Sequence, residues 1–414
     1  MGKEKTYSAI PYSGRRGAGI RRGLLAAGLL VAAFAATAQG LSFRSRKAAQ
    51  VGIVVRDLST GRETVSVNPE TALTPASITK CVTAASVFAA GLVDNSFETP
   101  AFISGSIDGD VLNGSVVIAG KGDPTTSLPS FPRGTGLTDS IASALCRLGV
   151  RKVTGSIFPD CSWVPSQGPN SRWEIGDAEW SYGAGLYAIN YNGNTRGVDK
   201  ALPDPPEAFA AEVESELGRR GITVEWGEEE PPLADSLLPL AAHKSACFDE
   251  ILSRMMVKSD NLFAEAMMRA LAPGGSLKAS LAREKELLGG LGLDTSSVGL
   301  FDGSGLSRND RFSARFLSLL LAKMAGRPDA ARYAALFPLA GRDGTVKKLL
   351  RGTRLEGKLA LKSGSMMGVL CYAGYKLDNN GKPTHAVVVM VNGYFCPSAE
   401  VRKAIQNFLL NTFS

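Results

Sequence analysis

The order of hydrophobic and polar positions along this chain predicts a sheet built from both ends of the sequence. Two short blocks, residues 52–58 and 64–67, predict a hairpin, and a small apolar block over residues 81–90 follows as a buried helix. Near the C-terminus come three strand-like blocks and one helix-like block, at residues 359–363, 369–376, 385–392 and 399–410. We expect these elements to close one domain.

A second region is predicted between these two parts, from about residue 97 to residue 241. It alternates strand-like blocks such as 111–119 and 152–158 with helix-like blocks such as 138–148 and 208–220. The acidic run Glu228-Glu229-Glu230-Pro231-Pro232 precedes the return to the first domain. The predicted fold class is α+β, an antiparallel sheet with helices and a nested α/β insertion.

The N-terminus has the pattern of an export signal. Arg15-Arg16 and Arg21-Arg22 precede an apolar run over residues 24–36, and Ala36-Thr37-Ala38 is a small-residue cleavage pattern. We expect residues 1–38 to direct export, so that the rest of the chain is periplasmic or otherwise extracytoplasmic. Removal of this segment and its retention as an uncleaved membrane anchor are both open.

The charge of the chain argues against nucleic acid as a partner. Its 46 Lys and Arg against 39 Asp and Glu give a net charge of +7, and many of the basic residues precede Gln50. The remainder is at most mildly basic, and no basic stripe with interleaved aromatic residues is present. About 370 residues follow the leader, which is enough for two domains.

Three short motifs occur in one order along the chain. They are Ser77-Ile78-Thr79-Lys80, Ser259-Asp260-Asn261 and Lys362-Ser363-Gly364. Each alone is a common chance pattern. Together they match the S-x-x-K, S-D-N and K-[ST]-G set of enzymes that transfer acyl groups through a serine ester.

The first two motifs supply an activated nucleophile. At the start of a helix, Ser77 and Lys80 lie on one face. If burial and the cationic neighbour Lys362 lower its pKa, Lys80 removes the proton of the serine. Ser259 then passes a proton between the lysine and the leaving group, and Asn261 orients Lys80 and a substrate carbonyl.

The third motif is predicted to lie on an edge strand over residues 359–365. Gly364 then lets a substrate backbone approach closely. The backbone N–H groups of Ser77 and Ser365 would form an oxyanion hole. The terminal carboxylate of the substrate is expected to bind Lys362, Ser363 and Ser365.

The scarcity of histidine supports lysine-assisted catalysis. The chain has two histidines, and neither is in a recognisable catalytic context. His385 lies in an apolar strand, where a structural role is expected. No H-E-x-x-H or Cys/His cluster is present, so we expect neither a metal nor a cofactor. Among the six cysteines, Cys146 and Cys161 flank a predicted strand; their pairing is open, and no disulfide is required.

Beyond the three motifs, the chain resembles the low-molecular-mass class C penicillin-binding proteins, the D-alanyl-D-alanine carboxypeptidase/endopeptidase family. The resemblance covers essentially everything after Ser45. It is carried by residues 120–125, 155–157 with Asp160, Trp173 with Asp177, 190–194, 258–265, 302–308, 339–345, and the Lys362 motif with Gly374-Tyr375.

The resemblance implies a serine-type D-Ala-D-Ala carboxypeptidase that acts on peptidoglycan stem peptides and also cuts cross-links as an endopeptidase. β-Lactam antibiotics would acylate Ser77 and inhibit it. Residues that bind the diamino-acid side chain in the family correspond to Asp177 and Arg308; the alternatives are that Asp177 caps a helix and that Arg308 closes a turn. The penicillin-binding domain would be discontinuous, over residues 39–96 and 242–414, with the inserted domain over 97–241.

Two features depart from the family pattern. Ser363 stands where threonine is usual, although the hydroxyl is retained. The further small domain that follows the Asn-rich strand in longer members is predicted to be absent or reduced to a loop. Two other functions stay open, a serine β-lactamase and a catalytically silent cell-wall-binding scaffold. The oligomeric state is not predicted.

Overall fold

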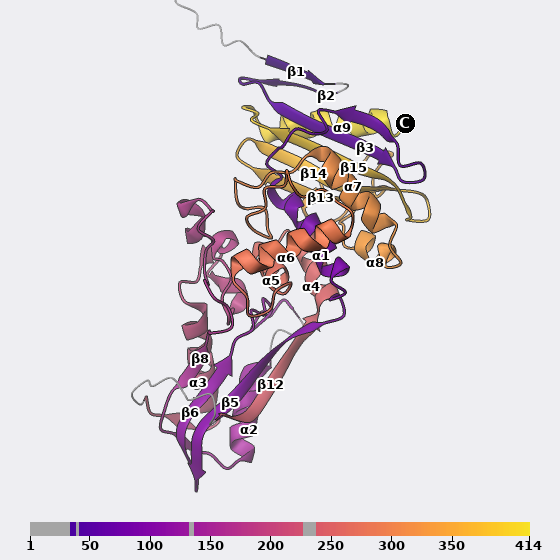
Figure 1. Ribbon diagram of the computed structural model, residues 1–414. Helices are drawn as coiled ribbons and strands as arrows, with labels where there is room; N and C mark the ends of the chain where they lie inside the picture. Colours follow the sequence, from indigo (N-terminus) through magenta and orange to yellow (C-terminus); the bar gives the residue numbers. More distant parts are fainter. Residues whose placement is uncertain (1–33, 39–40, 132–135, 227–236) are drawn as a thin grey trace, which may run out of the picture. The chain divides into compact units, whose positions relative to one another are not determined.

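The computed structural model describes residues 34–38, 41–131, 136–226 and 237–414 (Figure 1). Most of the predicted leader and the acidic run at residues 228–232 therefore lie outside the described residues. Strand β1, Phe34–Ala38, contains the predicted cleavage pattern and pairs antiparallel with β2, Leu41–Ser45. Within the described ranges, no helix has both the length and the apolar character that crossing a membrane requires.

An antiparallel sheet of five strands joins the two ends of the chain. Its order is β13–β14–β15–β3–β4, and every neighbouring pair is antiparallel. The strands are β3 Gln50–Asp57, β4 Glu63–Val67, β13 Leu359–Met366, β14 Val369–Leu377 and β15 Pro383–Asn392. The predicted antiparallel sheet is confirmed, and β13 is its edge strand, as expected.

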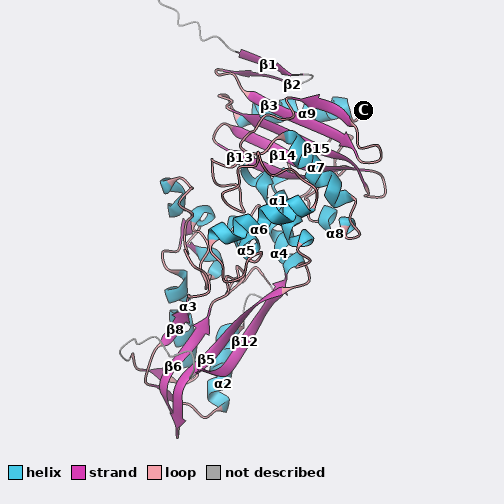
Figure 2. Cartoon of the chain, viewed as in Figure 1, coloured by secondary structure: helices cyan, strands magenta, loops and turns pink. Residues whose placement is uncertain are grey.

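Helices cover both faces of this sheet (Figure 2). Along β15, Val387 and Val389 belong to the core shared with α9, Ser398–Thr412, whereas Val388 and Met390 belong to the core on the other side. That second core includes α1, Lys80–Ala89, and α7, Ala314–Ala325. Because both faces are covered, the strands are continuous apolar blocks rather than alternating ones.

Four further helices lie on the α1 side of the sheet. They are α4 Phe248–Lys258, α5 Asn261–Arg269, α6 Leu277–Gly290 and α8 Ala330–Ala335, and each contacts α1. Ser259 ends α4 in the left-handed conformation, with φ 61°. The Asp260 side chain then accepts from the backbone N–H of Phe263 and caps α5. The Ser-Asp-Asn motif is thus the junction between two helices.

A second sheet is built from the middle of the chain and has its own apolar core (Figure 1). Its order is β11–β7–β6–β5–β12, with β8 paired to β6. The strands are β5 Ser96–Asp108, β6 Val111–Ala119, β7 Lys152–Val153, β8 Ile157–Asp160, β11 Thr223–Val224 and β12 Leu237–Cys247. Helices α2, Leu137–Arg147, and α3, Pro205–Arg219, pack against this sheet.

Two segments of this region differ from the predicted elements. The block predicted as one strand over 152–158 is two, because the ladder with β6 is interrupted opposite Gly114, which has φ 153°. The segment 190–194, predicted as a strand, contains a short 3₁₀ helix, Asn192–Asn194. There Asn190 Nδ2 donates to the Asp123 carbonyl and Asn194 Nδ2 donates to Asn190 Oδ1, so side-chain amides replace a strand ladder.

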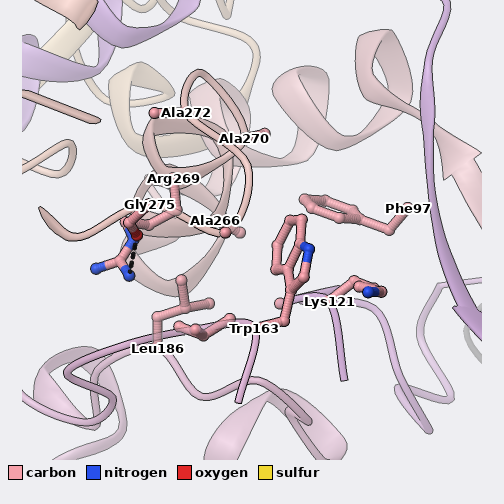
Figure 3. Close-up of a pocket in the computed structure, with 12 residues that line it drawn as sticks. Phe97, Lys121, Trp163, Leu186, Ala266, Arg269, Ala270, Ala272 and Gly275 are labelled. Carbon is pink, nitrogen blue, oxygen red and sulfur yellow. Dashed lines mark hydrogen bonds between the residues drawn. The ribbon is translucent and has the colours of Figure 1, made fainter. Parts of the chain in front are cut away.

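The middle region meets the helices beside α1 around Trp163, where residues of both regions line a small, mainly apolar pocket (Figure 3). Lys121 Nζ lies 5.1 Å from the centre of the Trp163 ring. On the helical side, Arg269 Nη2 donates to the carbonyls of Pro165, at 2.8 Å, and Gly275, at 3.1 Å. These contacts fix the C-terminal end of α5, the helix that begins at Asn261.

All six cysteines are free thiols in the structure. Cys81 and Cys371 are buried in α1 and β14. Cys146 is exposed and Cys161 is partly buried, and the pairing that the sequence left open between them is not formed.

Candidate active site

Ser77 lies in a short 3₁₀ helix, Ala76–Thr79, which leads directly into α1. The preceding residue, Ala76, has φ 49°, a conformation that costs energy for a residue with a side chain. The sequence predicted Ser77 at the start of a helix, and the structure has it one turn before the α-helix begins. The strained turn and the helix start together present Ser77 and Lys80 to the same cavity.

Lys80 is fully buried and its ammonium group is fully hydrogen-bonded. Its Nζ lies 3.1 Å from Ser77 Oγ, 2.7 Å from Asn261 Oδ1 and 2.7 Å from the Ser304 carbonyl oxygen. Burial lowers the pKa of Lys80 to about 8, against the opposing effect of nearby carboxyl groups, Asp302 first. A lysine with such a pKa is partly neutral near neutral pH and is then able to accept a proton from Ser77.

A second buried lysine lies beside Ser259. Lys362 Nζ donates to Ser259 Oγ at 2.8 Å and to the Ser363 carbonyl oxygen at 2.7 Å. Burial and then the charge of Lys80 lower the pKa of Lys362 well below its usual range. The left-handed backbone of Ser259 turns its hydroxyl toward this lysine instead of continuing α4.

The edge strand β13 runs close beside the Ser77 turn. A Cβ atom at Gly364 would lie 2.5 Å from the Pro75 carbonyl oxygen and 2.9 Å from the backbone N of Ser77. The sequence assigned this glycine to the approach of a substrate backbone. That role stays a prediction; in the structure the chain at residues 75–78 also lies close to Gly364, so any side chain at position 364 would push Ser77 away from β13.

One cleft of 560 Å³ contains most of the predicted site. It is lined by Ser77, Asp177, Tyr182, Ser259, Asn261, Arg308, Thr345, Ser363, Ser365 and Arg402, among others. Lys80 and Lys362 lie beneath it and reach it through their bonds to Ser77 and Ser259. The three motifs, far apart in sequence, therefore form one hydrogen-bonded group at the floor of a cleft.

Asp177 and Arg308 line the same cleft without bonding to each other. Asp177 Oδ1 accepts from the Tyr182 hydroxyl at 2.9 Å. Arg308 Nε lies 2.7 Å from Glu174 Oε1, and its Nη1 donates to the Met367 carbonyl at 3.4 Å. Asp177 lies inside a 3₁₀ helix, Ile175–Glu179, whose N-cap is Glu174, so helix capping does not explain it.

Sequence comparison identifies the protein family of this chain. The D-Ala-D-Ala carboxypeptidase 3 (S13) family matches the chain over residues 40–201 and 187–412. The chain belongs to this family. The predicted family and the predicted class of enzyme, a serine D-Ala-D-Ala carboxypeptidase, are both confirmed by this match.

Individual relatives agree with this assignment. The D-alanyl-D-alanine carboxypeptidase of Actinomadura sp. (strain R39) is 27% identical over 440 residues, which covers 84% of this chain and 78% of that protein. The D-alanyl-D-alanine carboxypeptidase DacB of Haemophilus influenzae is 24% identical over 418 residues, with 83% and 85% covered.

Solved structures share the fold of this chain. The crystal structure of penicillin-binding protein 4 (dacB) from Haemophilus influenzae superposes with a TM-score of 0.76, at 23% identity, and covers 88% of this chain and 96% of that one. A second crystal structure of that protein, in complex with a β-lactam, has a TM-score of 0.71, at 22% identity, with 89% and 97% covered.

In this S13 carboxypeptidase, buried acids support the floor of the cleft. Asp302 accepts from Trp173 Nε1 at 2.7 Å and from the backbone N–H groups of Gly305 and Ser307 at 2.6 and 2.7 Å. These bonds shape the loop whose Ser304 carbonyl receives the Lys80 ammonium. Asp302 thereby links the Trp173 segment, which continues to Asp177, to the loop that contacts Lys80.

Glu265 supports the same loop from α5. Its Oε1 accepts from the backbone N–H groups of Gly303 and Ser304, at 3.2 and 3.0 Å. Burial and then the charge of Asp302 raise the pKa of Glu265 to about 8. Both acids lie in the stretches that carry the family resemblance, but nothing in their spacing predicted that they shape the loop that contacts Lys80.

Three further residues of the S13 site were missed by sequence reasoning. Asn261 Nδ2 donates to the Tyr182 carbonyl oxygen at 2.9 Å, so a backbone atom of the middle region reaches the Ser-Asp-Asn junction. Thr345 Oγ1 lies 2.7 Å from Ser363 Oγ. Arg402, on α9, lines the cleft. A backbone carbonyl leaves no signal in a sequence, whereas Thr345 ends a stretch that already resembled the family.

The pKa values in this group predict a pH dependence of acylation. Because Lys80 must be neutral to accept a proton, kcat/KM is expected to fall about tenfold per pH unit below pH 8 and to level off above it. The midpoint belongs jointly to Lys80 and Glu265, since both have a pKa of about 8.

Replacing Glu265 by Gln tests this coupling. The carboxylate of Glu265 raises the pKa of Lys80, so its removal should shift the midpoint of the pH profile to lower pH. Glutamine keeps an oxygen to accept from Gly303 and Ser304, which preserves the loop. A profile of E265Q whose midpoint is unchanged or raised would contradict Lys80 as the titrating base.

Proposed function

We propose that this protein hydrolyses the terminal D-Ala-D-Ala bond of peptidoglycan stem peptides through an acyl-enzyme on Ser77. The observation that carries the proposal is the buried amine of Lys80, 3.1 Å from Ser77 Oγ and with a pKa of about 8. The family match supports the substrate class. Catalysis then depends on a lysine base rather than on a histidine.

In the acylation step, neutral Lys80 removes the proton of Ser77 as Oγ attacks the carbonyl carbon of the penultimate D-Ala. The backbone N–H groups of Ser77 and Ser365 stabilise the oxyanion. The C–N bond to the terminal D-Ala then breaks, and its nitrogen takes a proton from Ser259. Lys362, whose Nζ is 2.8 Å away, returns a proton to Ser259. In deacylation, water attacks the ester carbonyl and gives a proton to the Ser259–Lys362 pair. Protonated Lys80 then returns its proton to Ser77 Oγ as the ester C–O bond breaks.

A diamino acid at the third position of the stem peptide fits the charges beside the Tyr182 segment. Such a side chain carries both an ammonium and a carboxylate, and the cleft offers Asp177 and Arg308 for the two charges.

A cross-linked peptide presents the same bond type with a larger leaving group, so endopeptidase activity on cross-links is part of the proposal. β-Lactams, which acylate the serine in place of the peptide, are proposed as covalent inhibitors.

We further propose the division into a penicillin-binding domain over 39–96 and 242–414 and an inserted domain over 97–241, in an exported protein. The separate core around β5 and β6 supports this division. The two matched stretches of the S13 family meet at residues 187–201, where the chain passes from Asn194 through two short strands to α3. This supports the absence of a further inserted domain at that point.

The direct test is to follow three readouts with purified protein: D-Ala release from a stem pentapeptide, cleavage of a cross-linked dimer, and labelling by a fluorescent penicillin. We expect D-Ala release, and a stable label on the peptide that contains Ser77, identified by mass spectrometry. Rapid loss of the label would favour a β-lactamase. No label and no release from a folded protein would favour a wall-binding scaffold.

A further inference from the structure

The cleft contains a second arginine, Arg402, in addition to Arg308. It belongs to α9, whose residues Val401, Ile405 and Phe408 are buried against the five-stranded sheet. These contacts fix the rotation of the helix, and Arg402 is left half-buried in the wall of the cleft that also contains Ser77 and Ser365. Helix α9 therefore places a positive charge in the cleft from the face of the sheet opposite to α1.

Arg402 has a neutral, buried neighbour in the cleft. Tyr372 in β14, only 3% exposed, lines the same cleft, and the nearby Arg402 guanidinium opposes the rise that burial causes in the pKa of the Tyr372 hydroxyl. A guanidinium has five N–H donors, and among the described residues no hydrogen bond within normal distance occupies those of Arg402. The neighbouring hydroxyl therefore leaves the charge of Arg402 uncompensated.

The two arginines of the cleft differ in their ion pairs. Arg308 lies 2.7 Å from Glu174, so part of its charge is already compensated. Across the residues that the structure describes, Arg402 has no carboxylate within ion-pair distance. An arginine with an uncompensated charge in the wall of a cleft is suited to bind an anionic group of a ligand.

The register of the edge strand relates Arg402 to the substrate. Ser363 pairs directly with Tyr372, and Ser365 pairs with Leu370. Directly opposed residues in an antiparallel pair point to the same face and have Cβ atoms about 5 Å apart. A carboxylate held by the hydroxyls of Ser363 and Ser365 is therefore on the face where Arg402 meets Tyr372.

We infer that Arg402 binds the α-carboxylate of the leaving D-amino acid, together with Ser363 and Ser365, and so makes the enzyme selective for peptides with a free C-terminal carboxylate. The inference rests on the proposed function and adds to it a specificity-determining residue from the C-terminal helix. Arg402 acts on substrate binding and orientation, while proton transfer stays with the two lysines.

The test compares kcat/KM for two substrates, an N-acyl-D-Ala-D-Ala peptide with a free carboxylate and the same peptide as its C-terminal carboxamide. Wild-type protein should prefer the free acid. In Arg402→Gln, the ratio of kcat/KM for acid over amide should fall about tenfold or more, the size expected for a lost charged hydrogen bond. Arg402→Lys should retain part of the ratio, because it keeps the charge but loses the planar fork.

Two further variants separate binding from structure. Lys403→Gln makes the same charge change at an exposed position of α9 and should leave the ratio at its wild-type value. Tyr372→Phe removes the hydroxyl beside Arg402 but keeps the charge of Arg402, so it should lower the ratio by less than R402Q does. Each variant is checked by its thermal unfolding midpoint.

The outcomes distinguish this inference from the proposed function. If wild-type protein releases neither D-Ala from the free acid nor D-alaninamide from the carboxamide, the proposed function fails. If wild-type protein is active but R402Q keeps the wild-type ratio, the proposed function stands and the carboxylate role of Arg402 is overturned. Equal losses on both substrates in R402Q would mark Arg402 as structural and would also overturn the inference.

Discussion

Ser77→Ala is expected to abolish penicillin labelling and to lower the rate of D-Ala release by at least about 10³-fold. The reason is that Ser77 is the hydroxyl of the described site that lies within hydrogen-bonding distance of the buried amine of Lys80. Ser77 Oγ lies 3.1 Å from Lys80 Nζ, whereas the Ser259 hydroxyl is bonded to the second lysine, Lys362. Alanine removes the atom that forms the ester and changes little else.

The protein should remain folded in this variant, so that a loss of activity reflects the missing hydroxyl. Lys80 keeps its bonds to Asn261 and to the Ser304 carbonyl when Ser77 Oγ is absent. Ser86→Ala is a matched control in α1, the helix that follows Ser77, since the Ser86 hydroxyl is buried but donates to the Val82 carbonyl of α1 itself. Undiminished labelling of S77A, with unchanged thermal unfolding, would place the acylated residue elsewhere and remove the basis of the proposed mechanism.

Much of the fold was predictable because each element carries its own local pattern. The blocks at 111–119 and 369–376 were predicted nearly to their observed ends, since short, largely apolar runs between turn residues have few alternatives. The block at 152–158 was predicted as one strand because its break depends on Gly114 in a neighbouring strand. The Asn-rich segment failed for a related reason: its amides bond to Asp123 and to each other, which hydropathy does not record.

The part of the site that consists of motif side chains was predictable from the sequence. Lys80 and Lys362 were predicted because their motifs are short and ordered, and the structure brings both beside serine hydroxyls. The backbone carbonyl groups of Ser304 and Tyr182 complete the network, and any residue type supplies a carbonyl. Arg402 depends on the rotation of α9 against the sheet, which is a property of packing rather than of a motif.

The hydrogen bonds of Asp302 show how segments far apart in the sequence together form the surroundings of one amine, that of Lys80. The Lys80 ammonium needs an acceptor at the Ser304 carbonyl, and that loop is shaped by Asp302 and Glu265. Trp173 contributes a further bond to Asp302 from the middle region. Burial lowers the pKa of Lys80, and the opposing charges of Asp302 and Glu265 come from two other parts of the chain.

Lys80→Met is expected to reduce the second-order rate of penicillin acylation by about 10³-fold or more, with the pH dependence near pH 8 lost from the residual rate. Methionine has a similar length and suits a fully buried position, so the variant should remain folded by circular dichroism. The measurement is stopped-flow acylation across pH 6–10, beside the matched control Lys348→Met, which replaces an exposed lysine.

The same measurement decides between the two buried lysines. Lys80 contacts Ser77 directly, while Lys362 reaches the reaction through Ser259. If Lys80 is the base, K80M loses acylation and Ser259→Ala, measured in parallel, loses mainly the protonation of the leaving group. If instead K80M acylates within tenfold of wild type and Ser259→Ala does not, the base is the Lys362–Ser259 pair. Lys80 would then serve chiefly to hold Asn261 and the Ser304 loop in place.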